Sequence, residues 1–271
     1  MRLRFLKKSA LLGAAFAMLC SLGATAQADV IFTEDFAGTS GAIDSLDGTF
    51  EDTSGEEWEG NGFATDNGVF QVGQLEGSAT LSLANNALVA DTIYTLSLDV
   101  TSNSQEWIGL GFSDAAASGG NNTPGSRFSN ENRGRAWFLY RPGEAAVAGQ
   151  VEIFGGPGTQ DGIGDIDTDF TSGTAVTRTL SVVLDTASSG FRADFLIDGV
   201  SQSGGFQDLA NNTGFDFVGF TWEGPTVNNG TGSPITVDNF SFSDNNAVPE
   251  PGSIAVISFV GLIGMIRRRR S

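Results

Sequence analysis

Alternation of apolar and polar residues is the feature that most constrains what this chain can fold into. The clearest stretches cover residues 94–100, 180–184 and 191–197. Successive side chains of a β-strand point to opposite faces, so each stretch predicts a strand with one buried face. Asp198-Gly199 follows the third stretch and is typical of a tight hairpin turn. No interior stretch keeps a helical period for long, and we therefore expect an all-β fold.

Further strands are expected wherever a short apolar segment is bounded by Gly, Asn, Asp or Ser. These segments are residues 69–72, 79–83, 107–112, 136–140, 151–154, 215–222 and 235–242. Roughly a dozen strands in a body of this length predict one large sandwich of two packed antiparallel sheets. The 37 glycines are scattered rather than periodic, which excludes collagen and glycine-repeat solenoids.

Three features follow one another at the C-terminus. The motif Val248-Pro249-Glu250-Pro251 comes first, an apolar run over residues 252–266 follows, and Arg267, Arg268, Arg269 and Arg270 precede the last residue. The prolines keep the motif extended, and the arginines favour the cytoplasmic side of a membrane. The 15-residue run is short for a spanning helix, although snorkelling arginine side chains lengthen it.

This order of features resembles the PEP-CTERM sorting signal of Gram-negative bacteria, whose members are processed by exosortase, a membrane transpeptidase-like enzyme. The resemblance implies that residues 244–271 form a sorting signal with a single transmembrane helix over residues 252–266. The protein would be anchored transiently in the inner membrane and then reach the cell surface or extracellular matrix. The alternative is a permanent tail anchor without processing.

The N-terminus predicts export as well. Basic residues precede an apolar stretch over residues 10–22, and small-x-small sites end at Ala26 and Ala28. This is the pattern of a secretory signal peptide over residues 1–28. Leu19 stands before Cys20, where a lipoprotein signal carries a small residue, so we expect Cys20 to leave with the peptide. The mature protein then has no disulfide, and its core or bound ions must stabilise it.

Removal of both ends makes the body far more acidic than the whole chain. All 32 acidic residues lie between Asp29 and Glu250, together with six arginines and no lysine or histidine, so the body carries a net charge of −26. Nucleic acid is excluded as a partner because phosphate binding needs clustered positive charge. The acidic surface is either solvated with diffuse counter-ions or contains specific calcium sites.

A second resemblance covers most of residues 29–243. Phe32-Thr33-Glu34-Asp35-Phe36 opens the body, the alternating segments 94–100 and 107–112 follow, and Ile235-Thr236-Val237-Asp238-Asn239-Phe240 closes it. This pattern resembles concanavalin A-like or laminin-G-like jelly rolls. The resemblance implies that the first and last strands lie side by side in a two-sheet sandwich.

Several kinds of catalysis are excluded by composition. Without histidine or a mature cysteine, Ser-His-Asp and Cys-His systems and histidine-based zinc sites cannot form. A carboxylate pair would remain, but the Glu-x-Asp-x-x-Glu motif of laminarinase-like hydrolases is missing. The closest acidic cluster predicts a solvated loop around Gly55 and consists of Glu51, Asp52, Glu56, Glu57 and Glu59. We therefore expect that the chain is not an enzyme.

Candidate calcium ligands occur in one dense acidic run. They are Asp161, Asp165, Asp167 and Asp169. Their oxygens suit calcium, but Phe170 and Val176 occupy positions where an EF-hand loop needs Gly and Glu. The run is therefore either an irregular calcium loop or an acidic loop without a metal.

Aromatic residues are the candidates for sugar binding, because flat rings stack on pyranose faces. Most of them lie on expected strands, where a core role is predicted: Trp107, Trp137, Tyr140 and Trp222. Trp58 is flanked by glutamates, so we expect it to be exposed and to bind a ligand.

Together these patterns predict a non-enzymatic surface or exopolysaccharide-matrix protein of the biofilm type, exported and processed by exosortase. Exopolysaccharides or other glycans are its candidate partners, and calcium is its candidate cofactor. The alternatives are a carbohydrate-binding module that uses aromatic residues and calcium, and a secreted glycoside hydrolase or lyase.

Overall fold

The computed structural model contains a β-sandwich and, among the residues that it describes, no helix. The described residues are 28–36, 46–60, 63–66, 69–72, 77–102, 107–114, 116, 134–141, 149–155, 162–168, 176–210, 212–222 and 235–245. Within these ranges, no segment is a long apolar helix of the kind that crosses a bilayer. The predicted sorting segment 244–271 lies almost entirely outside them, as does the predicted signal peptide 1–28. A compact unit covers Val30–Asp244.

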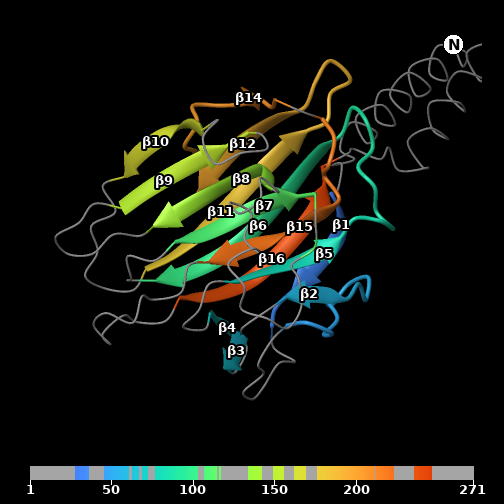
Figure 1. The fold of residues 1–271 in the computed structure, drawn as a ribbon, viewed down its shortest axis with the longest axis vertical. Coiled ribbons are helices and arrows are strands. Elements are labelled where there is room, and N and C mark those ends of the chain that lie inside the picture. The colour runs from blue at the N-terminus through green and yellow to red at the C-terminus, as the bar shows by residue number, and fades with distance from the viewer. Residues whose placement is uncertain are drawn as a thin grey trace, which may run out of the picture. The chain divides into compact units, whose positions relative to one another are not determined.

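The larger sheet has nine strands (Figure 1). Its main path runs β13 (Val200–Ser201), β12 (Arg192–Ile197), β11 (Val176–Asp185), β6 (Ile93–Ser102), β16 (Thr236–Asp244), β4 (Val69–Val72) and β3 (Phe63–Asp66). Two further strands lie off this path: β1 (Asp29–Glu34) pairs with β16, and β14 (Gln207–Asp208) pairs with β12. The first and last strands, β1 and β16, are therefore neighbours, as the jelly-roll resemblance implied.

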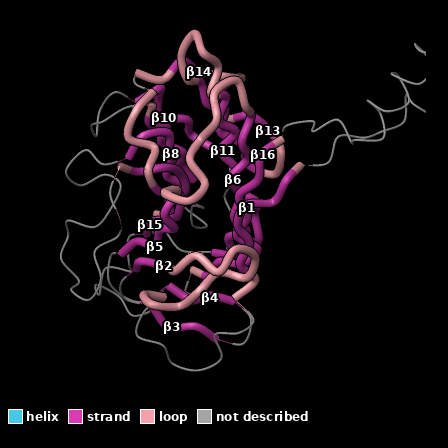
Figure 2. The backbone as a smooth tube through the Cα atoms, turned by 90° about the vertical axis from the view of Figure 1, so that its right-hand side faces the viewer, coloured by secondary structure: helices cyan, strands magenta, loops and turns pink. Residues whose placement is uncertain are grey.

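The second sheet has seven antiparallel strands. Its order is β10 (Gly162–Thr168), β9 (Gly149–Phe154), β8 (Gly134–Arg141), β7 (Ile108–Ser113), β15 (Phe217–Trp222), β5 (Gly77–Ser82) and β2 (Trp58–Gly60). Figure 2 shows the two sheets nearly edge-on as separate layers.

The core lies between the sheets and is built from the alternating residues. On β6 the buried side chains are those of Tyr94, Leu96, Leu98 and Val100, while the residues between them are half-buried. Aromatic rings connect the layers: the Phe112 and Phe242 centroids are 5.9 Å apart, and those of Phe138 and Phe195 are 5.8 Å apart. The predicted all-β class is confirmed for the described residues. The prediction that alternating apolar residues bury one face of a strand is also confirmed.

The β12–β13 hairpin has the predicted turn. Asp198 and Gly199 both have positive φ, 50° and 76°, the backbone that a two-residue turn between twisted strands requires. Asp198 Oδ1 also accepts the backbone N–H of Thr179 at 3.0 Å, and Asp198 Oδ2 accepts from Arg178 Nη1 at 2.5 Å. The turn is thereby attached to β11.

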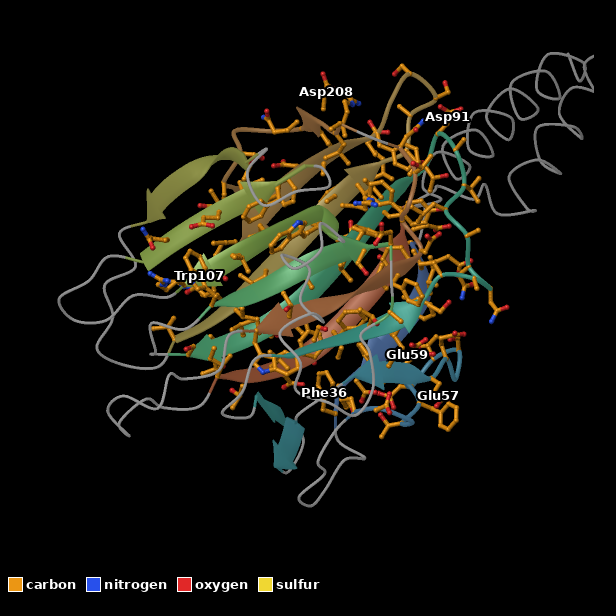
Figure 3. All side chains as sticks on the ribbon, viewed as in Figure 1. Phe36, Glu57, Glu59, Asp91, Trp107 and Asp208 are labelled. Atoms are coloured by element: carbon orange, nitrogen blue, oxygen red, sulfur yellow. The ribbon has the colours of Figure 1, made fainter. Side chains whose placement is uncertain are left out.

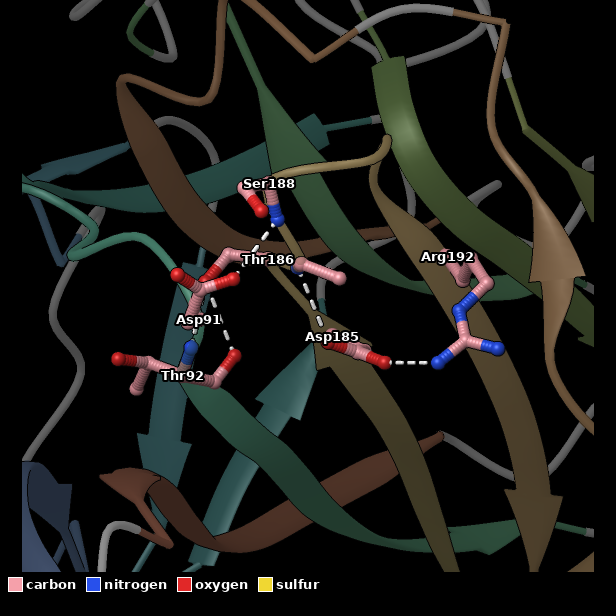
Figure 4. A network of polar contacts seen from close by, with 7 residues as sticks. Asp91, Thr92, Asp185, Thr186, Ser188 and Arg192 are labelled. Carbon is pink, nitrogen blue, oxygen red and sulfur yellow. Dashed lines mark hydrogen bonds and ion pairs between the residues drawn. The ribbon is translucent and has the colours of Figure 1, made fainter.

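A network of polar contacts joins the segment before β6 to the segment after β11 (Figure 4). Thr186 is fully buried; its Oγ1 accepts the N–H of Thr92 at 3.0 Å and lies 2.6 Å from Val89 O. Asp91, with φ of 57°, accepts the N–H of Ser188 at 2.9 Å. Buried polar groups need such partners, so this network fixes two connections at one end of the sheet.

Candidate functional site

A polar pocket of about 640 Å³ lies beside β1, β6 and β16. It is lined by Thr33, Glu34, Asp35, Asp52, Ser97, Asp99, Asn239, Phe240 and Ser241. Four of the nine residues are acidic, and Phe240 alone has an apolar side chain. We call it the acidic pocket.

Three carboxylates of the acidic pocket converge. One oxygen from each of Glu34, Asp35 and Asp52 lies within 4.8 Å of the others. Glu34 is only 4% exposed, whereas Asp35 and Asp52 are exposed. The ion pairs of the described residues join Arg135, Arg178 and Arg192 to other aspartates and do not include Glu34 or Asp52.

Glu34 is held by two donors, one two residues later in the sequence and one on strand β2. Phe36 donates its backbone N–H to Oε1 at 2.7 Å, helped by a positive φ of 54°, and the Trp58 indole donates to Oε2 at 3.3 Å. Burial raises the pKa of Glu34 to about 7, the charges of Asp52 and Asp35 add to the increase, and the two hydrogen bonds oppose it. The free energy of the fold is therefore less favourable when Glu34 is ionised without a nearby positive charge.

Asp52 is positioned by the neighbouring Glu51. Asp52 donates its N–H to Thr33 O at 2.9 Å and accepts the N–H of Asp35 at 3.1 Å. Glu51, only 3% exposed, accepts backbone N–H groups from Thr33, Thr53, Ser54 and Glu56 at 2.5–3.2 Å. The prediction that the whole acidic cluster around Gly55 is solvated is wrong for Glu51, because the backbone folds around its carboxylate.

The third side of the pocket comes from an irregularity in β16. Its pairing with β6 shifts register between Asp238 and Ser241, and Asn239 within the shift has φ of 49°. Asn239 Nδ2 donates to Asp99 Oδ2 at 3.0 Å. Burial raises the pKa of Asp238, and the charge of Asp99 adds to it. A bulge that re-aims side chains is common beside binding sites, and Asn tolerates the left-handed backbone it needs.

This arrangement fits a divalent cation. Calcium prefers carboxylate, amide and carbonyl oxygens in flexible geometry. Glu34, Asp35 and Asp52 would supply the charged ligands, with Asp99 and Asn239 nearby in the same pocket. A cation would also offset the repulsion and burial that raise the pKa of Glu34.

The predicted calcium ligands lie elsewhere. Asp165 and Asp167 are on β10, the edge strand of the seven-stranded sheet, paired with Glu152 and Gln150 of β9. Asp161 and Asp169 lie outside the described residues. The run is thus a strand rather than a loop over residues 162–168, and calcium binding there stays a prediction.

The prediction that Trp58 is exposed for ligand binding is wrong. Its side chain is fully buried, with its ring centroid 5.0 Å from that of Phe240 and 5.9 Å from that of Phe220. Trp58 opens β2, so it faces the core while Glu57 and Glu59 lie on the other side. The core roles predicted for the other tryptophans and Tyr140 are confirmed by their burial, although Trp107 and Trp137 lie outside the main core.

The acidic pocket itself was missed. In the sequence, Glu34 and Asp35 belong to the opening motif, and Asp52 belongs to the predicted acidic loop. Nothing in the linear spacing between Asp35 and Asp52 indicates that their chain segments hydrogen-bond to each other. One sequence signal could have found it: Glu34 alternates with Phe32 and Phe36, which places an acid on the apolar face of the first strand.

No protein-family model and no curated protein matches this sequence. Among solved structures, the chain is similar to an alginate lyase (15% identity, 66% of this chain and 82% of that one, TM-score 0.39). It is also similar to an endo-1,3-beta-glucanase from Streptomyces sioyaensis (14%, 81% and 97%, TM-score 0.46). A third match is the Trypanosoma rangeli sialidase in complex with sialic acid (14%, 87% and 33%, TM-score 0.46).

These matches correct one expectation. We predicted that the chain is not an enzyme because its sequence lacks the usual catalytic constellations, yet the solved structures that it matches include two hydrolases and a lyase. The missing motifs are therefore no ground for excluding catalysis. At this identity and TM-score, the matches assign no reaction to this chain.

Proposed function

We propose that this chain is an exported protein that exosortase processes and delivers to the cell surface or extracellular matrix, where its β-sandwich binds calcium and contacts glycans. The sorting part is supported by the order of Val248–Pro251, the apolar run 252–266 and Arg267–Arg270, together with the signal-peptide pattern of residues 1–28. The sandwich is proposed to be a concanavalin A-like jelly roll, which the pairing of β1 with β16 supports.

The observation that carries the calcium part is the convergence of Glu34, Asp35 and Asp52 within 4.8 Å around a buried carboxylate. Three acids at this distance repel one another, and burial of Glu34 adds to the cost. A bound divalent cation removes both penalties at once. Extracellular calcium-binding modules have Kd values of roughly 10⁻⁴–10⁻³ M, so a site of modest affinity suffices.

A thermal unfolding experiment tests the calcium part. The full chain, purified in detergent, is melted in EDTA and in excess calcium. At a free calcium concentration of 100 times Kd, binding stabilises the fold by about 2.7 kcal/mol. Asp52→Asn should abolish the calcium-dependent rise in Tm, whereas Asp208→Asn, an exposed aspartate on β14 (Figure 3), should keep it. A rise that both variants keep would place calcium elsewhere.

The sorting part has an independent test in the producing organism. Replacing Pro249, Glu250 and Pro251 with alanine should leave the protein unprocessed in the membrane fraction, because the motif would be lost while the anchor remained. Replacing the exposed Asn85 with alanine is the control for an unrelated surface change. Normal maturation of the triple variant would contradict processing at this motif.

A further inference from the structure

Arg141 ends β8 on the outer face of the seven-stranded sheet. Ala136, Phe138 and Tyr140 of the same strand belong to the core between the sheets, so alternation places Arg141 on the opposite side. Trp107 immediately precedes β7 and lies near one end of this sheet in Figure 3. We call Arg141, Trp107 and Gln150 the Arg141 cluster.

The guanidinium of Arg141 is held on two sides. Its central carbon lies 4.2 Å from the centroid of the Trp107 ring, within the range of a cation–π contact. Its Nη1 donates to Gln150 Oε1 at 2.9 Å. Gln150 is directly opposite Arg141 in the β8–β9 pairing, so the backbone register sets this contact. A planar cation fixed in this way loses little entropy when it binds a ligand.

Arg141 differs from the other described arginines in what it contacts. Each of Arg135, Arg178 and Arg192 has an aspartate as ion-pair partner. Among the residues that the structure describes, Arg141 has no ion-pair partner, and its side chain donates one hydrogen bond, to the neutral amide of Gln150. In a body with 32 acidic residues and six arginines, a half-buried arginine that has no ion-pair partner among the described residues is unexpected.

The surroundings of the cluster make it rigid. On the same face, Trp137 stacks on Phe154 with ring centroids 4.2 Å apart and planes inclined by 12°. Trp137 and Phe154 are cross-strand partners, as are Leu139 and Glu152, one pair closer to Arg141. The partly buried Leu139 packs against the stacked rings. These contacts hold β8 and β9 together and so preserve the position of Arg141 beside Gln150.

A guanidinium with unused N–H donors is the preferred protein partner for a carboxylate. The Gln150 amide adds a hydrogen-bonding group for a sugar hydroxyl, while the buried Trp107 ring holds the guanidinium in place. The net charge of −26 repels anions at long range, but salt screens it beyond about 8 Å, so direct contact with Arg141 decides binding. We propose that the Arg141 cluster is a binding subsite for the carboxylate of an acidic saccharide, an inference that rests on the proposed contact with glycans.

Calorimetric titration tests this subsite with two probes: an oligogalacturonate, and the same oligosaccharide with its carboxyl groups reduced to alcohols. The full chain is used in detergent and in EDTA, so that calcium cannot bridge protein and sugar. The wild type should bind the acidic probe at least tenfold more tightly than the reduced one. Absence of binding, or equal affinity for both probes, would overturn the proposal.

Three variants locate the effect. Arg141→Gln should weaken binding of the acidic probe about tenfold or more, the usual scale for one charge-assisted contact. Gln150→Glu should weaken binding of the acidic probe to a similar extent although Arg141 is kept, because the new carboxylate forms an ion pair with the guanidinium. Arg178→Gln removes the same charge from the other sheet and should have no effect. Unchanged binding in both Arg141→Gln and Gln150→Glu would refute the subsite.

The outcome separates this subsite from the calcium site. Acidic-probe binding that requires calcium and is the same in Arg141→Gln would overturn the subsite and leave the proposed calcium function intact. Arg141-dependent binding in a protein that shows no calcium-dependent rise in Tm would support the subsite and contradict the calcium site.

Discussion

Replacing Glu51 with glutamine should destabilise the sandwich far more than an exposed glutamate would suggest. The carboxylate accepts Ser54 and Glu56 N–H groups through Oε1, and Thr33 and Thr53 N–H groups through Oε2. A glutamine keeps one oxygen, so its NH₂ faces two N–H donors and all remaining hydrogen bonds lose their charge. Hydrogen bonds to a charged group contribute about 1.5–3 kcal/mol each, so we expect a loss of about 3 kcal/mol.

Thermal unfolding measures this loss. For a domain of this size, about 3 kcal/mol corresponds to a decrease in Tm of roughly 6–12 °C. Glu57→Gln is the matched control, since Glu57 is exposed in the same segment, and its effect should stay within about 0.5 kcal/mol. Equal Tm values for the two variants would refute the reasoning that Glu51 organises the segment carrying Asp52.

The pH dependence of the stability difference caused by Glu51→Gln has a predicted direction. Burial acts to raise the pKa of Glu51, but hydrogen bonds from Ser54, Thr53 and Glu56 outweigh it, and the pKa lies below its ordinary value. A depressed pKa contributes stability above the unfolded-state pKa that is lost as the pH falls through the folded-state pKa. The difference in Tm between wild type and Glu51→Gln should therefore shrink below about pH 4.5. A difference that grows with acidification would contradict this assignment.

Three further predictions concern the core and its connections. Thr186→Val should cost about 2 kcal/mol in chemical denaturation, because it leaves the buried N–H of Thr92 without its partner. Thr236→Val, at a half-buried position of β16, should be nearly neutral in the same measurement. Gly111→Ala should reduce Tm more than Gly199→Ala: an added Cβ at Gly111 would lie 2.3 Å from the Cβ of Trp137, whereas at Gly199 it meets nothing within 4 Å and only the positive φ is strained. All four tryptophans are at most 8% exposed, so acrylamide should quench the native fluorescence weakly and the denatured fluorescence strongly; strong native quenching would contradict their burial.

The sequence predicted the fold well where one face of a strand is buried and the other is open. Alternation identified β6, β11 and β12, and Asp198-Gly199 identified the turn after β12, because period and turn chemistry are local properties. The same rule applied to Trp58 would have placed it in the core. Its glutamate neighbours favour exposure only in a loop, because in a strand they lie on the opposite face.

The acidic pocket could not be predicted in the same way. It depends on the segment around Asp52 folding back onto β1, and on a bulge in β16 that brings Asn239 to Asp99. These are tertiary contacts between segments far apart in sequence, and no local pattern specifies them. The Asp165–Asp167 run misled for a related reason: dense acids favour a loop, but pairing with β9 makes the segment a strand.

Calorimetric titration of calcium into the EDTA-stripped full chain tests the central claim most directly. We expect saturable binding that Asp52→Asn weakens at least tenfold and Asp208→Asn leaves unchanged, because Asp52, unlike Asp208, converges with Glu34 and Asp35. No saturable binding, or equal affinity in the two variants, would contradict the assignment of a calcium site to the acidic pocket.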